Sequence, residues 1–117
     1  MNEGDIEVGP SISVSGQLLV SNLNLFSLID SRATHSYIAK HLGDKLEGNK
    51  RTLSSPFVTV TPVGDVYKSM SWFKDVPIKV GNSILYANLV EIEMRDFDVI
   101  LGIDWLNAHY AMIDCHR

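Results

Sequence analysis

The chain has 117 residues, of which 45% are hydrophobic, and its 10 Lys and Arg against 14 Asp and Glu give a formal charge of −4. This composition is typical of one folded domain, too short for an enzyme with two lobes around a cleft. The acidic balance argues against nucleic acid as a partner, because binding phosphates requires clustered basic residues, and only Lys50 and Arg51 are adjacent.

The N-terminus and the apolar runs give expectations about location. Residues Met1–Asp5 are polar and acidic, without the basic start and apolar stretch of a secretory signal. The apolar runs are far shorter than the roughly 20 residues of a membrane helix. The single Cys115 permits no internal disulfide, which favours a reducing compartment. We therefore expect a soluble intracellular domain over residues 12–117, with no membrane partner, preceded by a flexible segment over residues 1–11.

Apolar residues in the first part of the chain predict a hairpin followed by a helix. Two apolar stretches, 12–20 and 25–29, flank a turn-forming segment over residues 21–24, as in a β-hairpin. The residues that follow recur at a spacing of three to four, which predicts a short helix ending near Gly43; they are Tyr37, Ile38, His41, Leu42 and Leu46.

The second part of the chain predicts mainly strands. Alternating apolar residues indicate strands at 57–60, 66–73, 76–80 and 84–92, followed by a buried strand at 97–102. Asp104 is then expected to cap a short helix through Ala108, and residues 111–113 to form a final strand. Short strands separated by frequent turns indicate an all-β barrel or sandwich with one or two short helices.

One segment combines an apolar strand with an acidic residue at its end. Residues 28–38 run from Leu28 and Ile29 into Asp30, a hydroxyl residue and small residues. A carboxylate at the end of a buried strand is costly unless it is paired or serves chemistry. Taken alone, an aspartate at such a position is more often a turn or helix-capping residue than a catalytic one.

Residues 30–38, Asp-Ser-Arg-Ala-Thr-His-Ser-Tyr-Ile, resemble the active-site loop of the retroviral-type aspartic peptidases. The resemblance is closest to the gypsy-type long-terminal-repeat retrotransposons of plants, where the loop reads Asp-Ser-Gly-Ala-Thr-His-Ser-Phe-Ile. Residues 96–106 resemble the strand, glycine and helix that pack beneath this loop, and residues 113–115 resemble the strand that follows. The position of the family's flap hairpin is taken here by Thr61, Pro62, Val63, Gly64 and Asp65.

The resemblance covers residues 12–117 and implies a retropepsin-like closed β-barrel that forms a two-fold homodimer. Each chain would supply one catalytic carboxylate, Asp30, and the two carboxylates would hold a water between them. One acts as the base on that water while the other donates a proton to the peptide carbonyl, so the pair shares a single proton. The implied substrate is a polypeptide, namely the Gag-Pol polyprotein of a retrotransposon, and the implied location is the cytoplasm or a retroelement particle.

The resemblance also implies supporting roles around Asp30. Ser31 corresponds to the hydroxyl residue that hydrogen-bonds across the dimer, and Ala33 and Thr34 complete the loop. Gly102, which follows Leu101, would let the last strand approach that loop closely, because it has no side chain. Asp104 is expected to cap a helix rather than to act as a second acid.

Position 32 departs from the family, because Arg32 stands where the family has glycine. A side chain here would obstruct the cleft or swing out, with about 1–2 kcal/mol of strain if the backbone conformation favours glycine. Its charge would favour the ionised form of Asp30. Two hypotheses follow: an impaired aspartic endopeptidase whose Arg32 points away from the two carboxylates, or an inactive pseudo-protease that dimerises or binds peptides.

Other residues that could carry chemistry do not form a recognisable set. The histidines and Cys115 lack the spacing of metal ligands, so neither a metal nor another cofactor is expected. Four aromatic residues are expected in the core or in packing between flap and cleft; they are Tyr67, Trp72, Phe73 and Tyr86.

Overall fold

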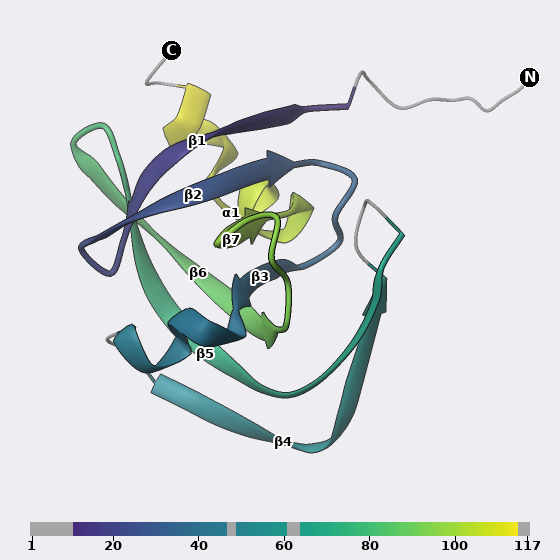
Figure 1. Cartoon of the computed structure of the whole chain (residues 1–117). Helices are drawn as coiled ribbons and strands as arrows, with labels where there is room; N and C mark the ends of the chain where they lie inside the picture. Colours follow the sequence, from purple (N-terminus) through teal and green to yellow (C-terminus); the bar gives the residue numbers. More distant parts are fainter. Residues whose placement is uncertain (1–10, 47–48, 61–63, 115–117) are drawn as a thin grey trace, which may run out of the picture.

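The computed structural model describes residues 11–46, 49–60 and 64–114, and for residues 111–114 it describes the backbone only. Within these ranges the chain forms strands, one 3₁₀ helix and one α-helix (Figure 1). In chain order they are β1 (Ser13–Val20), β2 (Leu23–Asp30), β3 (Ser36–Ala39), η1 (Lys40–Lys45), β4 (Asn49–Val60), β5 (Val66–Val80), β6 (Ser83–Ile92), β7 (Val99–Leu101) and α1 (Ile103–Asp114).

The strands form a single sheet that curls back on itself. Their order is β1-β2-β7-β3-β6-β5-β4, and β1 also pairs with β5 through Leu19 with Lys79 and Val20 with Ile78. The pairs β2–β7 and β3–β6 are parallel, whereas the remaining pairs are antiparallel. The predicted all-β fold and its first hairpin, β1 with β2, are therefore confirmed, and the sheet is a ring with β4 at one edge.

Apolar side chains fill the inside of this ring. The most deeply buried of them come from β3, β5, β6 and β7, and they include Tyr37, Ile38, Ile78, Leu89 and Leu101. Burial alternates along β6, as expected for a strand with one face on the core. The ring thus has a continuous core, and the loops at the ends of its strands are free to carry chemistry.

The long strand β5 contains an irregularity at Asp75. Asp75 has a φ of 56°, and the pairing with β6 shifts register between Phe73 and Val76. The Asp75 backbone N–H donates to Asn88 Oδ1 at 3.0 Å, which replaces a ladder bond. The two strands predicted at 66–73 and 76–80 are therefore one strand with a bulge.

Two helix predictions need correction. Residues Ser36–Ala39 are strand β3, and the helix that follows is a short 3₁₀ segment. All four residues of β3 are buried because the strand lies between β6 and β7 inside the sheet, so the alternating pattern of a half-exposed strand is absent. Helix α1 runs to Asp114 and includes residues 111–113, which were expected to form a strand, because no glycine or proline interrupts it.

The remaining expectations concern the ends of the chain and the start of β4. Strand β4 begins at Asn49, earlier than the predicted residue 57. The segment expected to be flexible lies outside the described residues except for Ser11, which is exposed. Cys115 also lies outside them. Within the described ranges, neither helix has the length and apolar character needed to cross a membrane.

Candidate active site

Asp30 is the last residue of β2, at the point where the chain enters the loop that leads to β3. Strand β2 lies between β1 and β7, and Asp30 pairs with Ser13 in the ladder with β1. The Asp30 side chain is 0% exposed in the single chain. A fully buried carboxylate needs partners, and the loop supplies them.

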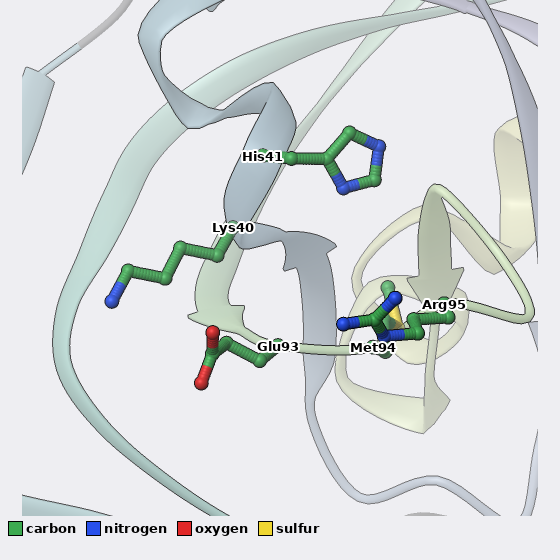
Figure 2. Close-up of a pocket in the computed structure, with 5 residues that line it drawn as sticks. All are labelled: Lys40, His41, Glu93, Met94 and Arg95. Carbon is green, nitrogen blue, oxygen red and sulfur yellow. The ribbon is translucent and has the colours of Figure 1, made fainter.

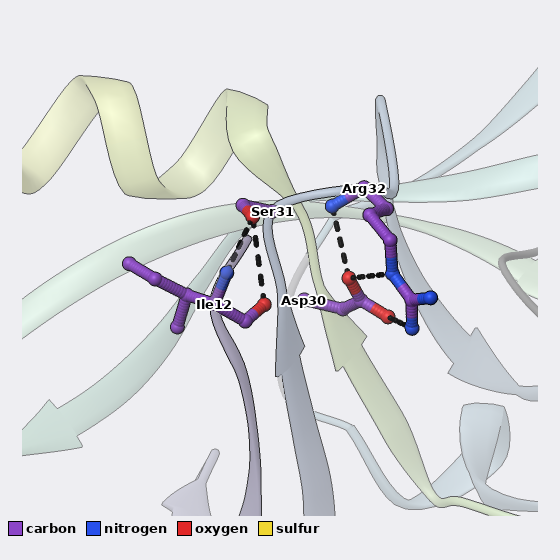
Figure 3. Close-up of polar contacts among 4 residues, drawn as sticks. All are labelled: Ile12, Asp30, Ser31 and Arg32. Carbon is purple, nitrogen blue, oxygen red and sulfur yellow. Dashed lines mark hydrogen bonds and ion pairs between the residues drawn. The ribbon is translucent and has the colours of Figure 1, made fainter. Parts of the chain in front are cut away.

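Arg32 covers the Asp30 carboxylate (Figure 3). The Arg32 backbone N–H and Nε donate to Asp30 Oδ1 at 2.9 and 3.1 Å, and Nη2 donates to Oδ2 at 3.0 Å. The guanidinium therefore makes a bidentate contact with both carboxylate oxygens, the geometry that makes Arg–carboxylate pairs strong and directional. Its outer face is open to solvent, since the Arg32 side chain is 56% exposed.

This geometry corrects two expectations about position 32. Arg32 folds onto Asp30 instead of pointing away from it, so the geometry assumed for an impaired enzyme is absent from the single chain. Its backbone is not left-handed: among the described residues, Ser21, Asn22 and Asp75 are the non-glycine residues with positive φ. The strain expected at Arg32 is therefore not present.

The contact with Arg32 sets the charge state of Asp30. Hydrogen bonds from the Arg32 side chain hold the pKa of the Asp30 carboxyl below its ordinary value of 3.8, although burial acts in the opposite direction. Asp30 is thus ionised at neutral pH. A carboxylate in this state can act as a base but cannot donate a proton.

Ser31 points to the other side of the loop, toward Ile12 (Figure 3). The Ile12 backbone N–H donates to Ser31 Oγ at 2.8 Å, and the Ser31 backbone N–H donates to the Ile12 carbonyl at 2.9 Å. In the single chain, the hydroxyl predicted to bond across a dimer thus ties the start of β1 to the loop. Ile12 was not among the predicted site residues, because an apolar residue outside a motif gives no sign of a backbone contact.

The rest of the loop is held by backbone bonds. The N–H of Ala33 donates to the Asp30 carbonyl at 3.1 Å, and the Ala33 carbonyl accepts from the Ile103 N–H at 2.7 Å. Ala33 is buried, whereas Thr34 is exposed and its hydroxyl contacts His35 Nδ1 at 3.0 Å. The loop is therefore anchored to the start of α1.

Gly102 packs against the backbone of this loop. A Cβ at Gly102 would lie 2.6 Å from the Ala33 carbonyl oxygen and would also overlap the His35 carbonyl oxygen. Leu101 precedes it and is fully buried in β7. The strand and the loop approach so closely that position 102 has no room for a side chain.

Ser36 and Asp104 complete the support beneath the loop. The Gly102 N–H donates to Ser36 Oγ at 2.9 Å, and the Ser36 hydroxyl donates to Asp104 Oδ1 at 2.8 Å. Asp104 Oδ1 also accepts from the Trp105 N–H at 2.8 Å. Asp104 is the second residue of α1, so it stabilises the first turn without being the N-cap itself. The part played by Ser36 was missed, although the serine lies within the loop motif.

The hairpin expected to act as a flap is formed by β4 and β5. The strands pair up to Val60 with Val66; residues 61–63 of the predicted flap lie outside the described residues. Gly64 has a φ of 93°, which suits glycine in a turn, and Asp65 accepts a hydrogen bond from Tyr67 at 3.4 Å.

The hairpin contacts the segment that follows the loop. The ring of Phe57 meets that of His35 edge-on, with a centroid distance of 5.1 Å, and the hydroxyls of Thr59 and Tyr37 lie 2.6 Å apart. In Figure 1 the ends of β4 and β5 at the hairpin tip rise on the side of the β2–β3 loop. The hairpin therefore approaches the end of the molecule that carries Asp30.

The predicted aromatic residues divide by position along the sheet. Phe73 is buried in the core, Trp72 and Tyr67 are half-buried, and Tyr86 is 53% exposed. The expectation of core or flap packing is therefore wrong for Tyr86, because alternate residues of β6 face opposite sides of the sheet.

A separate hollow of about 500 Å³ lies between η1 and the segment after β6 (Figure 2). Its walls are Lys40, His41, Glu93, Met94 and Arg95. None of these residues belongs to the loop after Asp30, so this hollow is not part of the candidate active site. Across the described ranges, no three His, Cys, Asp or Glu side chains are grouped as a metal site would require.

Comparisons with known proteins agree with this architecture. The entire chain, residues 1–117, matches the family described as retroviral aspartyl protease. The protease of EIAV, solved with the inhibitor HBY-793, superposes with a TM-score of 0.62 at 18% identity, over 88% of this chain and 93% of that one. The retroviral protease-like domain of Ddi1 from Leishmania major gives a TM-score of 0.60 at 17% identity, over 84% and 78%.

A sequence relative places a similar domain in a longer protein. The UBA domain-containing protein Mud1 of Schizosaccharomyces pombe is 30% identical over 88 residues, which are 75% of this chain but 26% of Mud1. The fold and the loop define a retropepsin-like aspartic protease domain. The chain belongs to the retroviral aspartyl protease family.

Proposed function

We propose that this domain is an aspartic endopeptidase that acts as a homodimer on polypeptide substrates. The observation that carries the proposal is the placement of Asp30, a buried carboxylate at the end of β2 in a loop fixed by Gly102 and Ser36. One chain supplies a single loop of this kind, and the two-carboxylate reaction requires two. The second Asp30 therefore comes from a second copy of the chain.

In this dimer the two Asp30 carboxylates activate a water for attack on the peptide carbonyl. The reaction needs one ionised and one protonated carboxyl group, because the first takes a proton from the water and the second gives one to the carbonyl oxygen. Two carboxylates at close range normally share one proton. Each Arg32 opposes this sharing by stabilising the ionised form of its Asp30, so the activity is impaired near neutral pH.

We further propose that the domain derives from a Gag-Pol polyprotein of a plant gypsy-type retrotransposon and acts in the cytoplasm or in a retroelement particle. The near-identity of residues 30–38 to that family's loop supports this origin. The similarity to Mud1 and to the Ddi1 domain supports a second origin, in which the domain is part of a longer cellular protein similar to these two.

The activity is tested by assaying the chain, its Arg32→Gly variant and its Asp30→Asn variant on casein between pH 3 and pH 7. We expect weak, pepstatin-sensitive cleavage by the native chain and about 10²-fold faster cleavage by Arg32→Gly, because restoring the general acid is worth about this factor. Asp30→Asn serves as the inactive control. Equal rates for the native chain and Arg32→Gly would show that Arg32 does not impair catalysis.

The same assay decides between the enzyme and the pseudo-protease. Under the inactive alternative, the bidentate contact of Arg32 with Asp30 keeps both carboxylates of the pair ionised. Cleavage by Arg32→Gly alone would make the native chain a pseudo-protease that dimerises or binds peptides. The mass in solution at micromolar concentration tests the dimer, since a stable monomer contains one Asp30 and would exclude the two-carboxylate mechanism under those conditions.

A further inference from the structure

Arg32 lies between solvent and the Asp30 carboxylate. The Asp30 side chain is buried in the single chain, and the Arg32 guanidinium contacts both of its oxygens. The Arg32 side chain itself is more than half exposed. A peptide that approaches the Asp30 carboxylate therefore meets the Arg32 guanidinium, and it reaches the carboxylate only after this guanidinium has moved.

The Arg32 guanidinium has donor groups that its contact with Asp30 leaves free. Nε and Nη2 donate to the Asp30 carboxylate, and Nη1 has no hydrogen-bond or ion-pair partner among the described residues. In Figure 3 this third nitrogen points away from the carboxylate. A guanidinium binds carboxylates through pairs of parallel N–H donors. The exposed side of Arg32 is thus suited to a second carboxylate, which another molecule brings.

A second carboxylate at Arg32 also affects the charge of Asp30. In the proposed dimer the two Asp30 carboxylates repel each other, and they share one proton unless a cation stabilises the doubly ionised pair. Arg32 is that cation in the single chain. An acidic group that draws Arg32 away from Asp30 therefore lets the pair take up a proton from water. The reaction requires this proton, because one carboxyl group must act as the general acid.

We infer that Arg32 selects substrates with an acidic side chain, Asp or Glu, beside the peptide bond to be cleaved, and that this side chain binds Arg32 and releases Asp30. The inference rests on the proposed function, because it requires a peptide to lie at the pair of Asp30 carboxylates. Peptides without such a side chain leave Arg32 on Asp30 and are cleaved slowly. Because water screens a half-exposed contact, we expect an acidic residue to be favoured over its amide by about fivefold.

The first test uses a sequence that the Arg32→Gly chain cleaves in casein, made as decapeptides with Glu or Gln placed at each position in turn. We expect the native chain to cleave the Glu peptide about fivefold faster at one position beside the cleaved bond, in kcat as well as in kcat/KM. Arg32→Gly should lose this preference, and Arg32→Lys, which keeps the charge, should retain part of it.

Arg95→Gly is the matched control for this test. Arg95 is an exposed arginine in the separate hollow beside η1, so its removal should leave the preference for Glu unchanged. Equal rates for the Glu and Gln peptides in the native chain would overturn the inference. A preference for Glu that survives Arg32→Gly would overturn it as well.

A second measurement does not depend on catalysis. In native protein labelled with ¹⁵N-arginine, the Nε–H signal of Arg32, identified by its loss in Arg32→Lys, reports on the bond to Asp30. We expect acetyl-Ala-Glu-Ala-amide at millimolar concentration to shift this signal more than that of Arg95, because binding at Arg32 weakens its bond to Asp30. The tripeptide with Gln should shift neither signal.

The two measurements separate the inference from the proposed function. If no variant cleaves casein but the acidic tripeptide shifts the Arg32 signal, the proposed enzyme fails and Arg32 stands as a binding site for acidic peptides. If casein is cleaved but the Glu and Gln tripeptides give equal shifts, the proposed function stands and the inference about Arg32 is refuted.

Discussion

Asp30 and Glu91 are both buried carboxylates near the end of a strand, yet they are held in different ways. Glu91 is 8% exposed, and its Oε1 accepts from the Ser71 hydroxyl at 2.8 Å and lies 3.5 Å from Lys50 Nζ. Its partners thus come from β5 and β4, which the fold brings together anyway. Asp30 takes its cation from Arg32, two residues further along its own loop.

This difference separates a structural carboxylate from one available for chemistry. Lys50 and Ser71 belong to strands of the sheet, whereas Arg32 belongs to the loop after β2 and its side chain contacts Asp30. Each carboxylate region also contains a glycine in close contact: Gly102 with the Asp30 loop and Gly43 with Glu91. The following changes test how far the two regions differ.

Adding a methyl group at the two glycines should have unequal effects. At Gly102 the new Cβ meets backbone oxygens of Ala33 and His35, which cannot move without the loop, and we expect Gly102→Ala to lower the free energy of unfolding by about 3 kcal/mol. At Gly43 the Cβ meets the carboxylate end of Glu91 and the edge of Phe73, and we expect about 1 kcal/mol. Urea titration of both variants measures the difference. Equal losses would mean that the Asp30 loop is no more rigid than the Glu91 side chain.

Truncating the structural carboxylate should cost stability without changing Asp30. Glu91→Ala leaves the Ser71 hydroxyl without its acceptor, for an expected loss of about 1–2 kcal/mol in the free energy of unfolding. Urea titration at pH 7 measures this loss. Lys50→Ala is the control, because that lysine is half exposed and its ion pair contributes less. A loss from Lys50→Ala as large as that from Glu91→Ala would place the stabilisation in the ion pair instead.

The contact between Asp30 and Arg32 should make stability depend on pH. The pKa of Asp30 is lowered in the folded chain, so its contribution is fully present above the ordinary value of 3.8 and is lost as the pH falls through the folded pKa. We expect the native chain to be more stable than Arg32→Ala at pH 7 and the two to converge toward pH 2. Thermal or urea unfolding at several pH values measures the gap. If the difference in free energy of unfolding between the two proteins stays constant down to pH 2, Arg32 stabilises the chain through packing and not through its charge.

Ser31→Ala should give the smallest change. The substitution removes the hydroxyl that accepts from the Ile12 N–H, a bond at an exposed position, and we expect a loss of about 0.5–1 kcal/mol in the free energy of unfolding. Sedimentation of the same variant tests the alternative role, since a hydroxyl that bonds across a dimer would also strengthen association. If association is unchanged, the Ser31 hydroxyl makes its hydrogen bonds within one chain and not across a dimer.

Part of the fold could be predicted from the sequence because some strands have one buried and one exposed face, and turn-forming residues separate the strands. Strand β6 shows this alternation, whereas β1 is exposed along most of its length and was located by its apolar residues and the turn that follows it. Strand β3 was predicted as helix, because it lies between two strands and has no exposed face from which a period of two could arise. The loop from Asp30 to Thr34 could be located from its motif, which is local in the chain.

The contacts made by that loop could not be predicted in the same way. The sequence places a cation two residues after Asp30, but either an outward or an inward rotamer of Arg32 is compatible with that spacing. The support from Ser36 to Gly102 joins residues 66 positions apart. The interruption in the pairing of β4 with β5 between Thr52 and Phe57 could not be predicted either, because Pro56 alone does not specify it.

The bulge at Asp75 has a consequence for how sequences of this fold can diverge. Residues of β5 before the bulge pair with β4 in the hairpin, whereas residues after it pair with β1 and close the ring. An insertion or deletion in the hairpin shifts the register of the first half only, since Asp75 and its bond to Asn88 interrupt the ladder. The hairpin can therefore change in length and composition over evolution while the ring that holds Asp30 keeps its register.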